Sequence, residues 1–205
     1  MHELKLSDGL ISMKCPFHTF MAGVLSAGVF VYLLRRKNSP TVKSLIEKYD
    51  LKEHPEGGYF KETFKSNVDT NVTVSGRTVT RKASTAIYFL IIPGNISRLH
   101  RIQSDEVWHF YLGGSMTVIE LDNNDPKGYR ATVLGSNVNN GELVQYTVKA
   151  GVWFGSFPNE GSEYSFVGCT VAPGFEFEDF ELGSCNSLCK EFPNAENIIK
   201  KMTRS

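Results

Sequence analysis

The stretch HRIQSDEVWHFYLGG, His100 to Gly114, lies between segments rich in β-branched and aromatic residues. It brings two histidines, two carboxylates, an arginine, a tryptophan and a tyrosine within a dozen positions. Side chains of these types serve in metal binding or acid/base chemistry, or form a polar turn beside a hydrophobic core. Because successive side chains of a strand point to opposite faces, Glu106 and Trp108 would share one face while His109 would occupy the other.

The segments around this stretch read as short strands separated by turn signals such as PGN, NNDPKG and NNGE. Many short strands at regular spacing are typical of a sandwich or a barrel, so we expect an all-β fold. Apolar residues at helical spacing predict one short amphipathic helix near residues 42–49, and a second short helix is expected at 194–202. The expected strands cover residues 57–64, 72–80, 84–92, 106–113, 116–122, 130–135, 143–154 and 164–171.

Composition limits the classes of partner. The 205 residues carry 22 basic and 22 acidic side chains, so no overall charge attracts nucleic acid, and we expect no nucleic-acid partner. The four cysteines form no CxxC pairs and are too few for a disulfide scaffold, which fits a reducing compartment.

Residues 15–34 contain no Asp, Glu, Lys or Arg, and as a helix they would span about 30 Å, the hydrocarbon thickness of a bilayer. The basic run RRK follows at 35–37, so the positive-inside rule predicts a single-pass membrane protein with its large domain in the cytosol. A cleavable signal peptide and a buried N-terminal helix are the alternatives. We therefore divide the chain into a tail with a membrane anchor (1–40), a main domain (41–184) and a C-terminal tail (185–205).

A longer stretch, PGNISRLHRIQSDEVWHFYLGG, resembles the first motif of the cupins, with Gly94, His100, Glu106 and Gly113 in the motif positions. The blocks HPEGGYFKETF, TAIYFLI and VGCTVAPGFEFEDFEL add a resemblance to the cupin family of poorly defined function called DUF985, or cupin type 5. The resemblance covers about residues 45–182. It implies a double-stranded β-helix (jelly-roll) barrel that is usually a homodimer.

Typical metal-binding cupins use three histidines and one glutamate inside the barrel. In this chain Ile102 replaces the second histidine, and residues 151–166, where the third would fall, contain none. We therefore expect no metal and no other cofactor, which disfavours a metal-dependent oxygenase. If a metal were bound, His100 and Glu106 would be its ligands.

Acid/base chemistry requires a histidine that titrates near neutrality, a carboxylate and a group that returns the proton. We predict a barrel that binds a small polar molecule, sugar-like or lactone-like, and acts as a metal-independent isomerase or epimerase. A non-catalytic binding or sensing module is the alternative. The predicted catalytic residues are His100, Glu106, Tyr88 and Tyr111, and the predicted substrate-binding residues are Glu56, Tyr59, Arg98, Arg101, Trp108, His109, Gln145, Trp153 and Tyr164.

Two other features are given structural roles. The stretch PGFEFEDFEL, residues 173–182, alternates phenylalanines with acids and is read as an edge strand or dimer contact with a solvated acidic face. Cys169 lies in an apolar strand and is read as an inert buried thiol.

Overall fold

The computed structural model describes residues 39–204 apart from residue 75. The chain divides into two compact units, Met1–Thr41 and Val42–Ser205, and the second unit is described below. It opens with helix α2 (Val42–Tyr49), whose apolar face buries Leu45. The helix ends at Asp50, which takes a left-handed conformation with φ of 49°.

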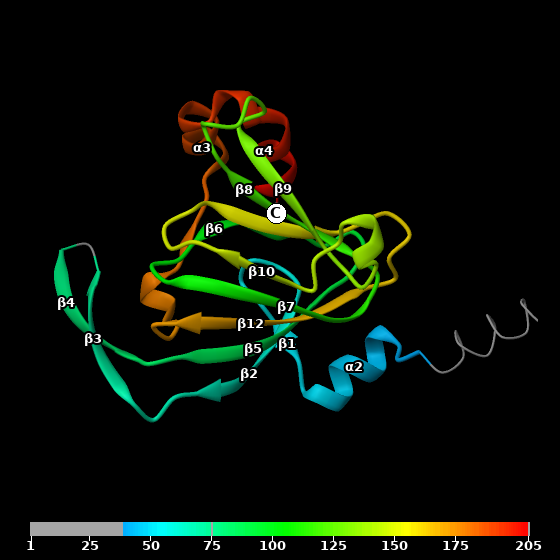
Figure 1. Ribbon diagram of the computed structural model, residues 1–205, viewed down its shortest axis with the longest axis horizontal. Coiled ribbons are helices and arrows are strands. Elements are labelled where there is room, and N and C mark those ends of the chain that lie inside the picture. The colour runs from blue at the N-terminus through cyan, green and yellow to red at the C-terminus, as the bar shows by residue number, and fades with distance from the viewer. Residues whose placement is uncertain (1–38, 75, 205) are drawn as a thin grey trace, which may run out of the picture. The chain divides into compact units, whose positions relative to one another are not determined.

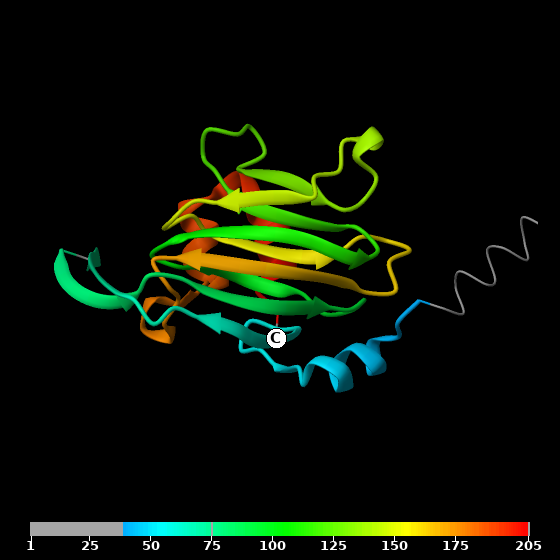
Figure 2. The same ribbon diagram turned by 60° about the horizontal axis from the view of Figure 1, so that its bottom comes forward.

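Two antiparallel sheets face each other and enclose the main core (Figures 1 and 2). The six-stranded sheet has the order β1 (Lys52–Glu53), β2 (Tyr59–Lys65), β5 (Thr85–Ile91), β12 (Ser165–Ala172), β7 (Asp105–Gly113) and β10 (Gln145–Val148). The five-stranded sheet has the order β13 (Glu181–Leu182), β6 (Ser97–Arg101), β11 (Phe154–Pro158), β8 (Met116–Leu121) and β9 (Tyr129–Leu134). Buried side chains from both sheets meet between them, and the expected mostly β architecture with short helices is present.

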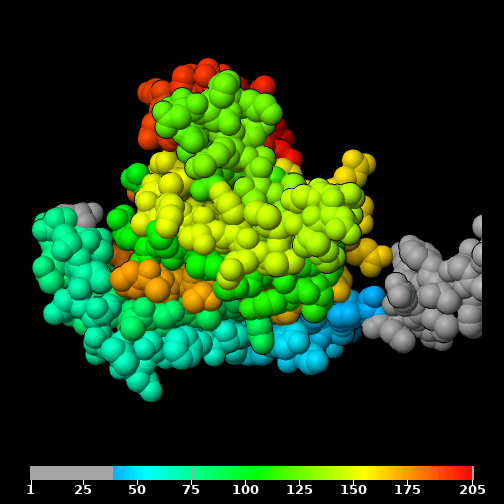
Figure 3. All heavy atoms as spheres, in the orientation of Figure 1, coloured from blue at the N-terminus to red at the C-terminus, as the bar shows by residue number. Residues whose placement is uncertain are grey.

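A separate hairpin of β3 (Asp69–Val74) and β4 (Arg77–Lys82) projects from one end of the sheets (Figures 1 and 3). The sequence predicted a single strand for residues 72–80, but Gly76, with φ of 77°, allows the chain to turn back there. Residues 143–154 likewise contain all of β10 and the first residue of β11, which belong to different sheets. Strand β6 was missed altogether.

The C-terminal residues form two helices, α3 (Cys185–Glu191) and α4 (Glu196–Met202), joined by the 3₁₀ turn η3 (Pro193–Ala195), where the sequence predicted one. They form a cap at one end of the unit (red spheres in Figure 3). A second buried cluster fills the space between these helices and the five-stranded sheet, and it includes Leu99, Ile119, Leu121, Trp153, Leu188, Ile199 and Met202.

The expected transmembrane helix is contradicted. Within the described residues 39–204, no helix is long and apolar enough to cross a membrane. The stretch that prompted the prediction, residues 15–34, lies outside the described residues. The single-pass topology, the cytosolic orientation and the membrane as a partner all depended on that helix and are corrected with it. The homodimer implied by the resemblance stays a prediction.

Replacement of Ile199 by alanine should lower the free energy of unfolding by about 2–5 kcal/mol, because its side chain is completely buried against the five-stranded sheet. Urea unfolding measures the change. The exposed neighbour Asn197 provides the matched control, since N197A should stay within about 0.5 kcal/mol of the wild type. Equal effects of the two variants would contradict the packing described for α4.

Candidate functional site

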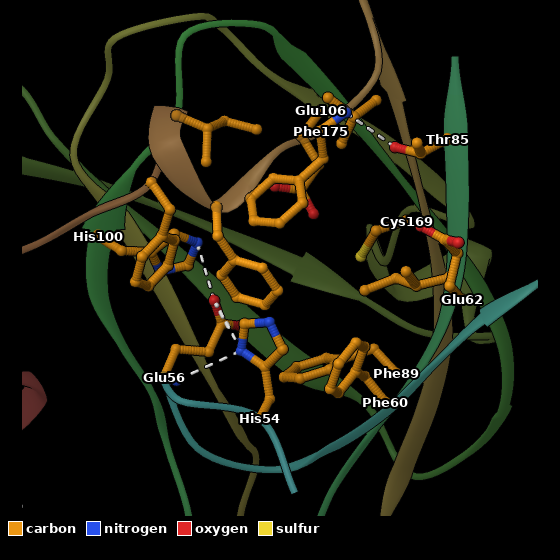
Figure 4. Close-up of a pocket in the computed structure, with 15 residues that line it drawn as sticks. His54, Glu56, Phe60, Glu62, Thr85, Phe89, His100, Glu106, Cys169 and Phe175 are labelled. Carbon is orange, nitrogen blue, oxygen red and sulfur yellow. Dashed lines mark hydrogen bonds and ion pairs between the residues drawn. The ribbon is translucent and has the colours of Figure 1, made fainter. Parts of the chain in front are cut away.

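A cavity of about 80 Å³ opens between the two sheets at the end where β2, β5, β6 and β7 approach one another. Figure 4 shows its 15 lining residues. They combine apolar walls with a small group of ionisable side chains, an arrangement typical of small-molecule sites. The ionisable lining residues are His54, Glu56, Glu62, His100, Glu106 and Cys169, and the others are Phe60, Thr85, Ile87, Phe89, Ile102, Val171, Phe175, Phe177 and Phe180.

The loop between β1 and β2, HPEGG, brings the Glu56 carboxyl from the six-stranded sheet to the five-stranded one. The Arg98 backbone N–H donates to the Glu56 carbonyl at 2.9 Å, so the loop is fixed along β6. Gly57 has φ of 111°, and a Cβ atom there would lie 2.1 Å from the carbonyl oxygen of Ile96. Only glycine permits this close approach, which explains the glycine that follows Glu56.

A bulge in β6 turns His100 into the cavity. Phe154 of β11 pairs with His100, whereas Ser156 pairs with Ser97, so β6 has one more residue than β11 between the two pairs. Regular alternation would put Ser97 and His100 on opposite faces. The additional residue places both on the inner face, and Leu99 between them packs outward beneath the C-terminal helices.

Glu56, His100 and Ser97 form a buried hydrogen-bonded group. The Ser97 hydroxyl donates to Glu56 Oε1 at 2.8 Å, and Glu56 Oε2 lies 3.1 Å from His100 Nε2. On its other side, His100 Nδ1 lies 2.7 Å from the Arg98 carbonyl oxygen, which can only accept, so Nδ1 carries a proton.

Burial determines whether the proton between Glu56 Oε2 and His100 Nε2 is bound to the carboxyl or to the imidazole. Desolvation raises the pKa of Glu56 and lowers the pKa of His100, because both charged forms are disfavoured away from water. Both shifts favour the neutral forms, a protonated Glu56 carboxyl that can donate to His100 Nε2 and an uncharged His100 ring. One proton is stored between the two groups and is shielded from solvent.

Glu106, on β7, is a second buried carboxyl that lines the cavity. Its side chain is buried (8% exposed), and desolvation raises its pKa from 4.5 to about 7. Its interactions with His100 and with the thiol of Cys169 oppose the rise. A carboxyl that titrates near neutral pH in a partly enclosed cavity can both accept and donate a proton under ordinary conditions.

His54 lines the cavity next to Glu56. Its Nδ1 accepts the Glu56 backbone N–H at 3.3 Å, so the neutral ring carries its proton on Nε2. Burial lowers the pKa of His54, and the ring is held edge-on against Phe60. A neutral imidazole with its N–H available is a hydrogen-bond donor that a ligand oxygen can use.

The donors in the cavity do not fit a metal ion. Among the described residues, no group of three or more His, Cys, Asp or Glu side chains is arranged to hold one. His100 Nε2 is engaged with Glu56, His54 Nδ1 accepts a backbone N–H, and Ile102 lines the wall where typical metal cupins have a histidine. The expectation of a metal-free site stays a prediction that elemental analysis can test.

Residues 173–182, which we call the strap, form one wall of the cavity. The sequence interpretation as an edge strand or dimer contact with a solvated acidic face is corrected in part. The phenylalanines Phe175, Phe177 and Phe180 line the cavity, and the 3₁₀ turn η2 (Phe177–Asp179) interrupts the alternation. The strap acids form ion pairs with the body of the domain: Glu176 with Lys65 at 2.7 Å, Asp179 with Arg81 at 2.7 Å and Glu181 with Arg101 at 2.6 Å.

Of the residues predicted for the site, His100, Glu106 and Glu56 line one cavity. The tyrosines do not. Tyr88 contacts Tyr111 and Phe166 on the other face of the six-stranded sheet, and Tyr111 is 48% exposed. Tyr88 lies between Ile87 and Phe89, which do line the cavity, and strand alternation turns it outward. Tyr164 is buried in the same outer cluster, so no tyrosine is available as the acid in this cavity.

The other predicted binding residues lie elsewhere. Tyr59 and Arg98 line an adjoining groove of about 360 Å³ on the far side of the HPEGG loop. Arg101 pairs with Glu181 and lies 4.5 Å from the ring centre of Trp153 on the helix side of the five-stranded sheet.

Three further predicted residues lie on β7 or its neighbour β10. Trp108 is buried in the core deeper than the cavity, with its ring edge-on to Phe89 and Phe154. His109 faces away from Glu106, as alternation predicts, and contacts Thr170 and Gln145 at 3.1 and 3.2 Å.

Sequence reasoning missed His54, Ser97, Cys169 and the phenylalanines as parts of the site. His54 could have been found, since it precedes Glu56 by two positions in a block that the family resemblance covers. The inward orientation of Ser97 depends on the bulge in β6, which has no signal in the sequence.

Replacement of Glu106 by glutamine should change how stability depends on pH. The folded-state pKa of about 7 exceeds the ordinary value of 4.5, so the wild type loses stability as pH rises through this interval, whereas E106Q does not. From about pH 4.5 to 8, E106Q should gain roughly 3 kcal/mol relative to the wild type. Urea unfolding across this range measures the difference. The exposed carboxylate variant E160Q should follow the wild type, and a pH-independent difference for E106Q would contradict the burial assigned to this carboxyl.

Comparison with known proteins agrees with this architecture. The family described as Cupin superfamily (DUF985) matches residues 43–183. The uncharacterised protein YML079W of Saccharomyces cerevisiae is 35% identical over 150 residues, which cover 68% of this chain and 73% of the yeast protein. A hypothetical protein from Leishmania major has 35% identity and a TM-score of 0.72 over 81% of this chain and all of its own. Protein SO0799 from Shewanella oneidensis has 32% identity and a TM-score of 0.70 over 81% of this chain and 99% of its own.

The match spans both sheets and every residue that lines the cavity. With its two facing antiparallel sheets and the inward His100 and Glu106, this chain belongs to the DUF985 family of the cupin superfamily.

Proposed function

We propose that this protein binds a small polar molecule, sugar-like or lactone-like, in its barrel cavity and acts as a metal-independent isomerase or epimerase. The observation that supports this proposal is the Glu106 carboxyl, which is buried, lines the cavity and has a pKa of about 7. A general acid or base works best when its pKa lies near the operating pH. Perturbed carboxyls in cavities are also enriched at functional sites.

The cavity offers the three roles that such a reaction needs. Ionised Glu106 removes a proton from a carbon next to a carbonyl group, and the electron pair moves to the carbonyl oxygen. The N–H at Nε2 of His54 donates a hydrogen bond to that oxygen. The proton stored on the Glu56–His100 pair returns to carbon, and exchange with solvent restores both carboxyls once the product leaves.

The apolar walls favour this chemistry. Phenylalanines from β2, β5 and the strap exclude water, which strengthens each electrostatic interaction inside. The volume of about 80 Å³ is far below the roughly 300–1,000 Å³ of sites for drug-sized ligands, so the ligand in this arrangement has few non-hydrogen atoms.

A non-catalytic binding or sensing module is the second candidate. The hydrogen bonds among Glu56, Ser97 and His100 satisfy these groups without any ligand. Such an internally satisfied network is what a rigid receptor wall requires. In that case the same cavity would bind its ligand without breaking a bond to carbon.

Incubation of the full-length protein with small hydroxy-aldehydes, hydroxy-ketones and lactones in deuterated water tests the catalytic proposal. We expect deuterium at a carbon next to the carbonyl group, detected by NMR. E106Q should exchange ~100-fold or more slowly, because a positioned base contributes at least this factor. The matched control E160Q replaces an exposed carboxylate outside the cavity and should retain the wild-type rate.

The pH profile gives an independent readout. The exchange rate should rise with pH through a midpoint near 7 as Glu106 ionises. H100A should also exchange more slowly, because the imidazole that accepts from the Glu56 carboxyl and positions its proton is then absent. Full exchange by E106Q or by H100A would remove the role assigned to that residue, and binding without any exchange would favour the non-catalytic module.

A further inference from the structure

The charged residues around the cavity indicate which charge its ligand has. Three carboxyls, Glu56, Glu62 and Glu106, line the cavity, while none of its lining residues, all within the described part of the chain, is Lys or Arg. Among these lining residues, the imidazoles of His54 and His100 are the basic groups, and burial lowers the pKa of each. The wall is therefore negative or neutral, and it offers an anion no fixed positive charge.

Basic residues near the rim are engaged by carboxylates, and Lys65 also interacts electrostatically with Glu62. Lys65, Arg81 and Arg101 each contact a carboxylate of the strap, at 2.7, 2.7 and 2.6 Å. Arg98 acts on Glu56 from the adjoining groove, where its guanidinium donates to the carbonyl of Pro55. A ligand inside the cavity consequently meets carboxyls rather than cationic side chains.

The Glu106 carboxyl lines this cavity and receives few hydrogen bonds from the described residues. Its carboxyl is more than nine-tenths buried, and the thiol of Cys169 is the hydrogen-bond donor assigned to it among the described residues. A thiol is a weak donor, and a carboxylate has about four acceptor positions. Most of the acceptor capacity of Glu106 is thus left for a ligand.

The aromatic walls favour the same kind of ligand. Phe60, Phe175, Phe177 and Phe180 line the cavity, and Phe177 is 55% exposed. The faces of aromatic rings carry partial negative charge and attract ammonium groups, most strongly at desolvated sites. Rings and carboxyls together form a receptor for positive charge.

We propose that the cavity takes a small ligand with a positively charged nitrogen, held by the carboxylates of Glu62 and Glu106 and by the phenylalanine faces of the strap. This inference rests on the proposed function and names its substrate class: a small amino-substituted hydroxy-carbonyl compound. An ammonium group beside the reacting carbon withdraws electrons and makes its proton easier to remove. A carboxylate ligand would instead add a negative charge next to Glu106.

A matched set of probes tests the ligand's charge. Ethanolamine, ethylene glycol and glycolate have nearly the same size and are cationic, neutral and anionic at about pH 7.5. Isothermal titration calorimetry on the full-length protein should give a dissociation constant for ethanolamine at least ~10-fold lower than that for ethylene glycol, because an opposite charge nearby is worth about one pKa unit or more. Glycolate should bind weakest.

Variants locate the effect in the cavity. E62Q and E106Q should each reduce the preference for ethanolamine over ethylene glycol, while E160Q keeps it. Carbon-13 NMR of the Glu106 carboxyl should show its pKa falling when ethanolamine is added. Equal affinities, tighter binding of glycolate, no binding of ethanolamine, or an unchanged preference in both cavity variants would overturn the proposal.

The outcomes separate this inference from the proposed function. Deuterium exchange on a neutral hydroxy-carbonyl compound, without a preference for ethanolamine, would refute the ligand charge and leave the proton transfer standing. A clear cation preference without exchange on any compound, amino-substituted ones included, would refute the catalysis and leave the ligand class standing.

Discussion

The contact between Glu56 and β6 is the interaction on which the site depends. Glu56 belongs to the loop between β1 and β2 of the six-stranded sheet, yet its carboxyl contacts Ser97 and His100 of the five-stranded one. Its backbone carbonyl accepts from Arg98 as well, so the loop and β6 are joined through both main chain and side chain. This contact fixes the distance between the sheets at the end where the cavity opens.

Desolvation raises the pKa of both buried carboxyls of the cavity, Glu56 and Glu106, but their partners differ. Glu56 shares its proton with His100 in a pair that is neutral as a whole, because each charged form is costly away from water. Glu106 interacts with the weakly donating thiol of Cys169, and its pKa is about 7. Carboxyls whose surroundings give them different protonation states at one pH can act as separate acid and base.

The sequence predicted the part of the site that depends on motif and alternation. The outward orientation of His109 follows from the strand pattern, and the motif resemblance predicted that His100 and Glu106 share one cavity. Alternation applied to Tyr88, between Ile87 and Phe89, would also have predicted its outward position. The fold class was predictable as mostly β, because the periodicity of the strands is strong.

The remaining features depend on contacts between distant segments. The bulge in β6 arises from pairing with β11, more than fifty positions later in the chain. The inward turn of the strap depends on ion pairs with β2, β4 and β6, so its alternating acids were read as a solvated face. The membrane prediction is contradicted for the described residues 39–204, none of whose helices is long and apolar enough to cross a membrane.

The position of Cys169 has a consequence for resistance to oxidants. Burial and the neighbouring Glu106 raise the pKa of its thiol well above the ordinary range. Peroxides and disulfide reagents attack the thiolate, which this environment suppresses. The Cys169 thiol in the cavity wall should therefore react with peroxides and disulfides more slowly than the thiol of an exposed cysteine.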